Sequence, residues 1–387
     1  MTMKIKRMNM DIGNSISFAM FNGEMNIMEI PTAVVSLSEA KAKGYFSDEV
    51  AKSKLKESLM LKVEDQYYLV GEAAVQFLGN DAHIGATVHE KTTSNLSMIM
   101  FYALIALYDA EQNMDKEESS SMVMDYFSTM LPIFEVLEAP KFSDKTEEMA
   151  ARFKGKFEFE VATKGCTKKI QVETKRSECY IEGQVAKFAL KYKFDLTESD
   201  TAEKFDRHYT INNDMGGGTI DQVRLGKRLD NPKSRNDFKS ITEAPFLGMV
   251  KKLYEEKLRK YSFKSARDVE QFIVRHYESD SYHVVNSLTG EKTDITTIID
   301  EALREYTHDV METILRQYPS IQGEVYKYNY YGGVAPILRK YIKEYVVEKY
   351  GEEVFEKYHH IEPDNTARFL NLYGLEIISR QATLVGK

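Results

Sequence analysis

The chain opens with alternating apolar and polar positions. Residues 4–10 indicate a first strand, and apolar side chains at alternate positions over 16–20 indicate a second. Asn22-Gly23, a dipeptide typical of two-residue hairpin turns, stands between this strand and the segment 25–30, which we expect to return as a third strand. From 38 to 80 polar positions dominate, which is typical of a small surface subdomain.

Helical spacing appears further along the chain. Over 295–318, apolar residues recur three and four positions apart, as on one face of a helix. The apolar run 92–108 and the segments 184–191 and 244–261 also predict helices. Residues 122–131 indicate one strand or buried segment before Pro132. Further strands are expected over 157–161, 170–172, 209–211, 220–225 and 325–331, and a further helix has Pro336 in its first turn.

The most informative pattern is a repeat. A strand, an Asp-x-Gly turn and a second strand occur at Asp11-Ile12-Gly13-Asn14. The same order recurs about half a chain length later, at Asp214-Met215-Gly216-Gly217-Gly218-Thr219. Two halves that each begin with an acidic, glycine-containing hairpin predict a duplicated α/β architecture with a cleft between the halves.

The composition narrows the classes of function. The length of 387 residues suggests two or three domains, and the formal net charge of −8 disfavours direct binding to nucleic acid, which needs clustered Lys and Arg. Cys166 and Cys179 alone cannot form a zinc site or a disulfide framework. No signal peptide is recognisable, and the most apolar stretch, 98–108, is about half the length that spans a bilayer. We therefore expect a cytoplasmic protein that does not contact a membrane.

The residues of the first hairpin are suited to an anion and its counter-ion. Gly13 allows the backbone to approach a ligand closely, and backbone N–H groups around such a turn form an anion-binding concavity. Asn14 and Ser15 add side-chain donors. Asp11 cannot bind phosphate itself, so it would hold a hydrated divalent cation or orient water. Alone, this pattern has little specificity.

The second hairpin is more specific. Gly216, Gly217 and Gly218 expose successive N–H groups before Thr219, and glycines in a strand often mark the close approach of another group. Asp214 at the strand end could share the cation of the first hairpin. Neither hairpin has the terminal Gly-Lys-Ser/Thr of a P-loop or the G-x-G-x-x-G of a Rossmann fold, so both of these classes are excluded. The pair is suited to a polyphosphate bound with magnesium.

In these residues the sequence resembles the superfamily of actin, Hsp70 and the sugar kinases, whose two phosphate hairpins match the Asp11 and Asp214 segments. The adenosine motif of that superfamily resembles Tyr331-Gly332-Gly333-Val334-Ala335-Pro336. Within it, the chain is most similar to the ParM/Alp-type bacterial actin-like proteins of plasmid segregation. The connecting motif of that group resembles Ile181-Glu182-Gly183-Gln184-Val185-Ala186, and its closing segment resembles Ala367-Arg368-Phe369-Leu370-Asn371-Leu372-Tyr373-Gly374.

The resemblance implies an α/β fold of two related, ribonuclease H-like domains around a nucleotide cleft, each with a smaller subdomain. Domain I would comprise residues 1–207 with a C-terminal return over 366–387, and domain II would comprise 208–365. The ligand would be ATP or GTP with Mg²⁺. The sequence departs from the superfamily after Gly333, where a third glycine is common and Val334-Ala335 stands instead.

The resemblance also implies roles for individual residues. Asp11 and Asp214 would hold Mg²⁺ through water, and Glu182 would position the attacking water; Gln184 remains an alternative that the sequence leaves open. The nucleotide would contact Gly13, Asn14, Ser15, Gly216, Gly217, Gly218, Thr219, Gly332 and Gly333, and its ribose would contact Glu255 or Glu256.

Three functions remain open on these grounds. The first is an actin-like ATPase that forms filaments in a nucleotide-dependent way and moves plasmid DNA through an adaptor protein bound to a centromere-like site. The second is a small-molecule kinase of the same superfamily, acting on a sugar or an acid, although no substrate-binding Asp stands out in the first domain. The third, a chaperone of the Hsp70 type, is disfavoured because no peptide-binding domain is expected after residue 387.

Overall fold

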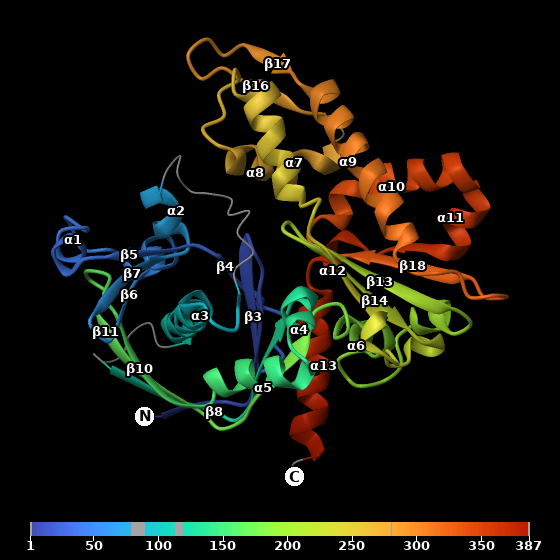
Figure 1. The fold of residues 1–387 in the computed structure, drawn as a ribbon. Helices are drawn as coiled ribbons and strands as arrows, with labels where there is room; N and C mark the ends of the chain where they lie inside the picture. Colours follow the sequence, from blue (N-terminus) through green and yellow to red (C-terminus); the bar gives the residue numbers. More distant parts are fainter. Residues whose placement is uncertain (1, 79–89, 113–118, 280, 386–387) are drawn as a thin grey trace.

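The computed structural model describes residues 2–78, 90–112, 119–279 and 281–385. Its elements form two halves, each built on a five-stranded sheet (Figure 1). The last helix, α13 (Leu370–Val385), returns to pack on the N-terminal half, against α6 (Ala186–Lys191) and the strands of its five-stranded sheet. The division into an N-terminal and a C-terminal half therefore does not follow the chain at its end.

The two five-stranded sheets have the same topology. The N-terminal sheet has the order β4 (Met28–Pro31), β3 (Ile16–Phe21), β2 (Met8–Ile12), β9 (Phe127–Leu131) and β12 (Ser177–Ile181). The C-terminal sheet has the order β15 (Phe238–Ile241), β14 (Ile220–Leu225), β13 (Tyr209–Met215), β18 (Tyr326–Tyr331) and β19 (His359–Ile361). In each, the first three strands are antiparallel and the last two run parallel to the third. This shared topology confirms the predicted duplication.

A seven-stranded sheet adds a subdomain to the N-terminal half. Its order is β1 (Thr2–Ile5), β8 (Ser119–Met124), β11 (Lys168–Thr174), β10 (Gly155–Val161), β6 (Met60–Val63), β7 (Gln66–Val70) and β5 (Val34–Leu37). The segment 38–80, which we expected to be a small surface subdomain, contributes β6 and β7 to this sheet. It also forms a small core of its own around Leu37, Met60 and Leu69.

Two predicted strands were wrong in one respect, because each is divided between two sheets. Residues 4–10 form β1 and β2, and residues 122–131 form β8 and β9. The strands β11 and β12 are divided in the same way. At the bend the backbone remains paired: Asp125 N donates to Ile5 O and Lys175 N donates to Met124 O, both at 2.9 Å. A hydrophobic pattern cannot show such a bend, since apolar residues continue through it.

The turn at Asn22-Gly23 forms, but the return strand begins later than predicted. Both residues have positive φ, 56° and 76°, and Glu24 N donates to Phe21 O at 3.0 Å. Strand β4 nevertheless starts at Met28, which pairs with Ala19. The connection is therefore longer than a two-residue hairpin.

The remaining helices are divided between the two halves. In the N-terminal half they are α1 (Glu39–Lys43), α2 (Glu72–Leu78), α3 (Asn95–Gln112), α4 (Ile133–Glu138) and α5 (Phe142–Arg152). In the C-terminal half they are α7 (Phe246–Leu253), α8 (Ala266–His276), α9 (Thr296–Arg316), α10 (Ala335–Tyr350), α11 (Glu352–Tyr358) and α12 (Asp364–Ala367), with the hairpin β16 (His283–Val285) and β17 (Lys292–Asp294). Within the described ranges, no helix is both long and apolar enough to cross a bilayer.

The predicted helices are present, with two differences that matter later. The helix expected over 244–261 ends as α7 at Leu253 and continues as one π-helical turn, Tyr254–Leu258. The helix expected over 184–191 begins only at Ala186, because a turn precedes it. Helix α3 is buried on nearly every side, which explains its continuous apolar sequence.

A buried carboxylate holds α13 to the N-terminal sheet. Glu376 has no exposed surface and accepts hydrogen bonds from Arg7 Nε at 2.8 Å and from Asn9 Nδ2 at 2.7 Å. Arg380, one turn further along α13, also donates a hydrogen bond from its Nε to the Glu376 carboxylate and forms an ion pair with it. Because Arg7 lies at the bend between β1 and β2, this cluster joins the end of the chain to its beginning.

We expect Glu376→Ala to lower the free energy of unfolding by about 3 kcal/mol, since it leaves two buried or half-buried guanidinium groups without their partner. Urea unfolding measures the loss. The control is Glu344→Ala, which removes an exposed ion pair with Arg304 and should cost less than about 1 kcal/mol. Equal losses in the two variants would contradict a special role for the buried cluster.

Candidate functional site

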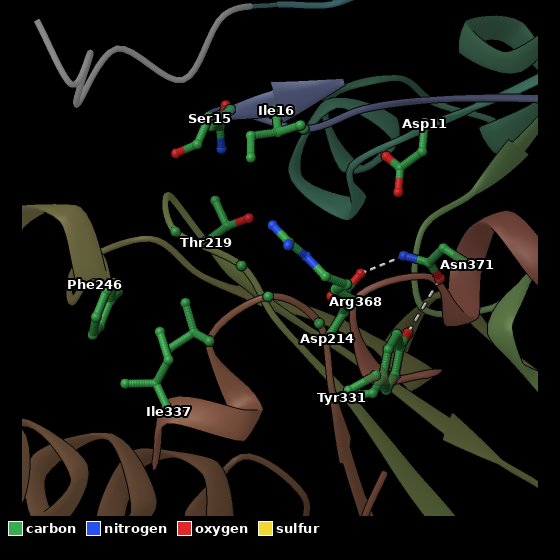
Figure 2. A pocket seen from close by; sticks show the side chains of 18 of the residues that line it. Asp11, Ser15, Ile16, Asp214, Thr219, Phe246, Tyr331, Ile337, Arg368 and Asn371 are labelled. Atoms are coloured by element: carbon green, nitrogen blue, oxygen red, sulfur yellow. Dashed lines mark hydrogen bonds between the residues drawn. The ribbon is translucent and has the colours of Figure 1, made fainter. Parts of the chain in front are cut away.

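The two predicted hairpins face each other across a cavity of about 450 Å³ between the halves. The β2–β3 turn supplies Gly13, Asn14 and Ser15 to its wall, and the β13–β14 turn supplies Gly216, Gly217 and Thr219. Figure 2 shows Ser15 and Thr219 on opposite sides of the cavity. The shared topology of the two sheets explains this placement, because each hairpin joins the second and third strands of its sheet.

Several glycines of these hairpins are required by close contacts. A Cβ on Gly13 would lie 2.5 Å from Ile16 O, and a Cβ on Gly216 would lie 3.0 Å from Thr219 O. Gly218 does not line the cavity. A Cβ there would lie 2.4 Å from Asn14 Nδ2, so the tips of the two hairpins are in contact.

Four carboxylates converge at the inner end of the cavity. Asp11 and Asp214 lie near the ends of β2 and β13, Asp221 lies on β14, and Glu182 follows β12. Burial raises the pKa of Asp11 to about 7, and the negative charge of Glu182 adds to this effect. Burial and the same charge raise the pKa of Asp221 to about 7. Burial, followed by Glu182, Asp221 and Asp11, raises the pKa of Asp214 well above its ordinary value.

A lysine that we did not predict lies among these acids. Lys91 forms an ion pair with Glu182, and both side chains are almost buried. Burial alone would lower the pKa of Lys91, but Glu182 and Asp11 raise it to about 12. Sequence reasoning missed Lys91 because it belongs to no motif and is one of 52 basic residues.

Two further side chains fix the backbone that carries Lys91. The Glu135 carboxylate accepts hydrogen bonds from the backbone N–H groups of Lys91 and Thr92, at 2.6 and 3.1 Å. From the other side, Arg152 Nη1 donates to Lys91 O at 2.8 Å. The position of the lysine is therefore determined by α4 and α5, the helices that carry Glu135 and Arg152.

The C-terminal segment positions Asp214. Asn371 on α13 donates to Asp214 Oδ2 at 2.5 Å and accepts from the Tyr331 hydroxyl at 3.4 Å (Figure 2). Gly332 follows Tyr331 with a φ of 92°, and a Cβ there would lie 2.5 Å from Asp214 Oδ1. Gly332 and Gly333 both line the cavity, as expected of the adenosine motif.

Side chains of the C-terminal half form hydrogen bonds with both ends of α4. Asp221 Oδ2 accepts from Ile133 N, the first residue of α4, at 3.0 Å. Arg235 donates to carbonyl oxygens at the other end, those of Leu137, Ala139 and Pro140. An acid at the start of a helix and a base at its end match the helix dipole. Movement of either half would therefore be transmitted to α4 and to Glu135 on it.

Besides Gly218, three predicted site residues lie outside the cavity wall. Gln184 lies in the turn before α6, and Glu255 and Glu256 are exposed on the π-helical turn, which buries Leu258 instead. The carboxylate that does reach the cavity from this region is Glu270 on α8, which accepts from Ser15 Oγ at 3.0 Å. The extra residue in the π-turn changes which side chains face inward, and the sequence gives no sign of it.

The donor set fits a hydrated magnesium ion. Among the described residues, no group of three His, Cys, Asp or Glu side chains is arranged to bind a metal directly. Mg²⁺ commonly keeps several waters and uses one or two carboxylates together with substrate phosphates. Asp11 and Asp214 provide carboxylates of this kind in the wall of the cavity.

Comparison with known proteins identifies relatives of this fold. A family model described as the Alp7A C-terminal domain matches residues 209–365. The crystal structure of the actin-like protein Alp7A superposes with a TM-score of 0.91 and 36% sequence identity, over 99% of this chain and 98% of that chain. No curated protein matches the chain closely.

Two more distant structures share the fold. Bacillus thuringiensis ParM with ATP has a TM-score of 0.68 at 16% identity, over 99% of this chain and 100% of that chain. A 15-stranded ParM filament from Clostridium botulinum has a TM-score of 0.64 at 13% identity, over 98% of this chain and 100% of that chain.

The raised pKa of Asp221 predicts how stability without nucleotide depends on pH. Folding favours the protonated carboxyl, so stability should fall as the pH rises from the ordinary pKa of 3.8 towards about 7. We expect Asp221→Asn, which faces Glu182, Lys91 and Asp214 without a charge, to remove part of this loss. Between pH 5 and 7, the free energy of unfolding of Asp221→Asn relative to that of the wild type should rise by on the order of 1 kcal/mol per pH unit.

Thermal melts in EDTA at several pH values test this expectation. Asp309→Asn, at an exposed position of α9, is the matched control and should follow the wild type at every pH. Parallel curves for Asp221→Asn and wild type would show that the carboxyl is already ionised in the folded protein at pH 5.

Proposed function

The chain belongs to the Alp7A family of actin-like proteins, and from this membership we propose that it is an ATPase that polymerises into filaments in a nucleotide-dependent way. The observation that supports the proposal most strongly is the cavity itself. Two topologically identical hairpins face each other there, with four carboxylates and one lysine at its inner end. Such a site suits a nucleoside triphosphate bound between two halves that can change their relative position.

The phosphates would bind between the hairpins. Backbone N–H groups around Gly13 and over Gly216 and Gly217 are the donors, with Ser15 and Thr219 adding hydroxyls. The base and ribose would extend past Gly332 and Gly333 at the start of α10. Mg²⁺, held by Asp11 and Asp214 through water, would supply positive charge to the phosphates. A solved structure of a distant relative is described as ParM with ATP, which supports the choice of nucleotide.

Glu182 is the residue that we assign to the attacking water. It lies at the inner end of the cavity, where a terminal phosphate would stand, and its carboxylate can accept a hydrogen bond from water. The ion pair with Lys91 fixes its orientation. Hydrolysis would then depend on positioning and on charge neutralisation, as phosphoryl transfer generally does.

We further propose the domain division 1–207 with 366–387 and 208–365, with the nucleotide between the domains. Filament formation would occur in the cytoplasm, and the role would be plasmid segregation. The net charge of −8 supports attachment to DNA through an adaptor protein at a centromere-like site rather than directly. Similarity to Alp7A along the whole of both chains favours this function over that of a small-molecule kinase.

We expect ATP with Mg²⁺ to produce a rise in light scattering and a pelletable polymer, followed by slower release of phosphate. GTP serves as the comparison for nucleotide preference, and EDTA serves as the control that removes the cation. Absence of polymer with ATP, GTP and a non-hydrolysable analogue at high protein concentration would contradict the filament function.

Glu182→Gln should slow phosphate release by about 100-fold while polymers still form and last longer, because the amide cannot act as a base towards the water. The control is Gln184→Ala, two residues away and outside the cavity wall. Phosphate release measured during a pelleting assay compares the two. If Gln184→Ala slows release and Glu182→Gln does not, the role belongs to Gln184.

A further inference from the structure

Arg368 occupies a prominent place in the cavity without a role in the scheme above. It stands at the end of α12, just before α13, and its backbone is fixed there because Gly332 N donates to the neighbouring Ala367 O at 2.9 Å. Figure 2 shows its side chain pointing up into the cavity, between Ser15 and Ile16 on one side and Thr219 on the other. The guanidinium therefore lies between the two hairpins.

The guanidinium rests on an aromatic ring but has no polar partner in the described part of the chain. Its Cζ lies 5.3 Å from the centroid of Phe18 and 5.9 Å from that of Phe369. No hydrogen bond or ion pair connects it to any described residue. Burial raises the pKa of Glu270, which the charges of Arg267 and Arg368 partly oppose, and the Glu270 carboxylate is beyond ion-pair distance from Arg368. A half-buried guanidinium with five N–H donors is costly in this state unless a ligand or water satisfies it.

The neighbouring arginines of the same cavity wall each have at least one polar partner, although the buried Nε of Arg267 has none. Arg267 Nη2 donates to Ser15 O at 3.4 Å, and Arg275 Nε donates to Gln271 O at 3.1 Å. Among the described arginines of the cavity wall, Arg368 is the one that has neither a hydrogen bond nor an ion pair. Its cation–π contact with Phe18 supplies no oxygen acceptor, so the N–H donors of the guanidinium stay available to a ligand.

We propose that Arg368 binds the phosphate chain of the nucleotide, as a second cation beside the magnesium. The inference rests on the proposed nucleotide site. A guanidinium edge forms paired hydrogen bonds with phosphate oxygens, and its permanent charge suits a ligand with several negative charges. The location between the two phosphate hairpins favours phosphate contact over stacking on the base.

Equilibrium binding of fluorescently labelled ATP, with ATP, ADP and adenosine as competitors, tests this assignment on protein kept below the concentration at which it polymerises. For Arg368→Gln we expect affinities for ATP and ADP to fall by about 10- to 100-fold, while the affinity for adenosine changes less than about twofold. Arg368→Lys keeps the charge but not the fork, so its affinity should be intermediate. Arg316→Gln, at an exposed arginine on α9, is the control and should bind like the wild type.

Two results would overturn the assignment. Unchanged affinity for ATP and ADP in Arg368→Gln would show that the guanidinium does not touch the ligand. An equal loss for adenosine would place it against the base or ribose. Thermal melts of each variant identify a general loss of folding, which would reduce binding of all three ligands together with the melting temperature. If the wild type itself binds no nucleotide, the proposed function fails, which differs from both results.

Discussion

The requirement that dominates this structure is electrostatic: four carboxylates meet in one buried place with a single lysine among them. Lys91 neutralises Glu182, and the remaining acids carry raised pKa values because burial and mutual repulsion oppose their ionisation. Such a group of acids is stable as a set of anions only with a further positive charge. The protein therefore keeps a site that is poorly satisfied when empty and that the proposed divalent cation and its ligand would complete.

The rest of the fold brings these acids together from distant parts of the chain. Duplication of one sheet topology places Asp11 and Asp214 at equivalent turns that face each other. Contacts from other segments then fix them, since Asn371 near the chain end holds Asp214 and the start of α4 holds Asp221. Because α4 is bound by the C-terminal half at both ends, a shift between the halves changes the same structure that carries Glu135 and positions Lys91.

The sequence revealed those parts of the site in which a residue type is required by backbone geometry. Gly13, Gly216 and Gly332 leave no room for a side chain, so glycine patterns marked the turns correctly. It could not reveal Lys91 or Arg368, because a single basic residue acquires its meaning only from tertiary neighbours. The sequence also did not predict the bend between β1 and β2, because hydrophobic spacing continues through it. Nor did it predict the π-helical turn Tyr254–Leu258, because a single added residue creates that turn.

The contact between Gly218 and Asn14 has a consequence for how a bound ligand would leave the site. With the hairpin tips against each other, protein from both halves covers the side of the cavity where we propose that the phosphates bind. A nucleotide bound in this way could not leave with its phosphates first. It would leave with its base first, or only after the two halves separate. The lifetime of the bound nucleotide would then be set by the rate at which the two halves open. Neighbouring subunits in an assembly that restrain this opening would therefore also slow nucleotide exchange.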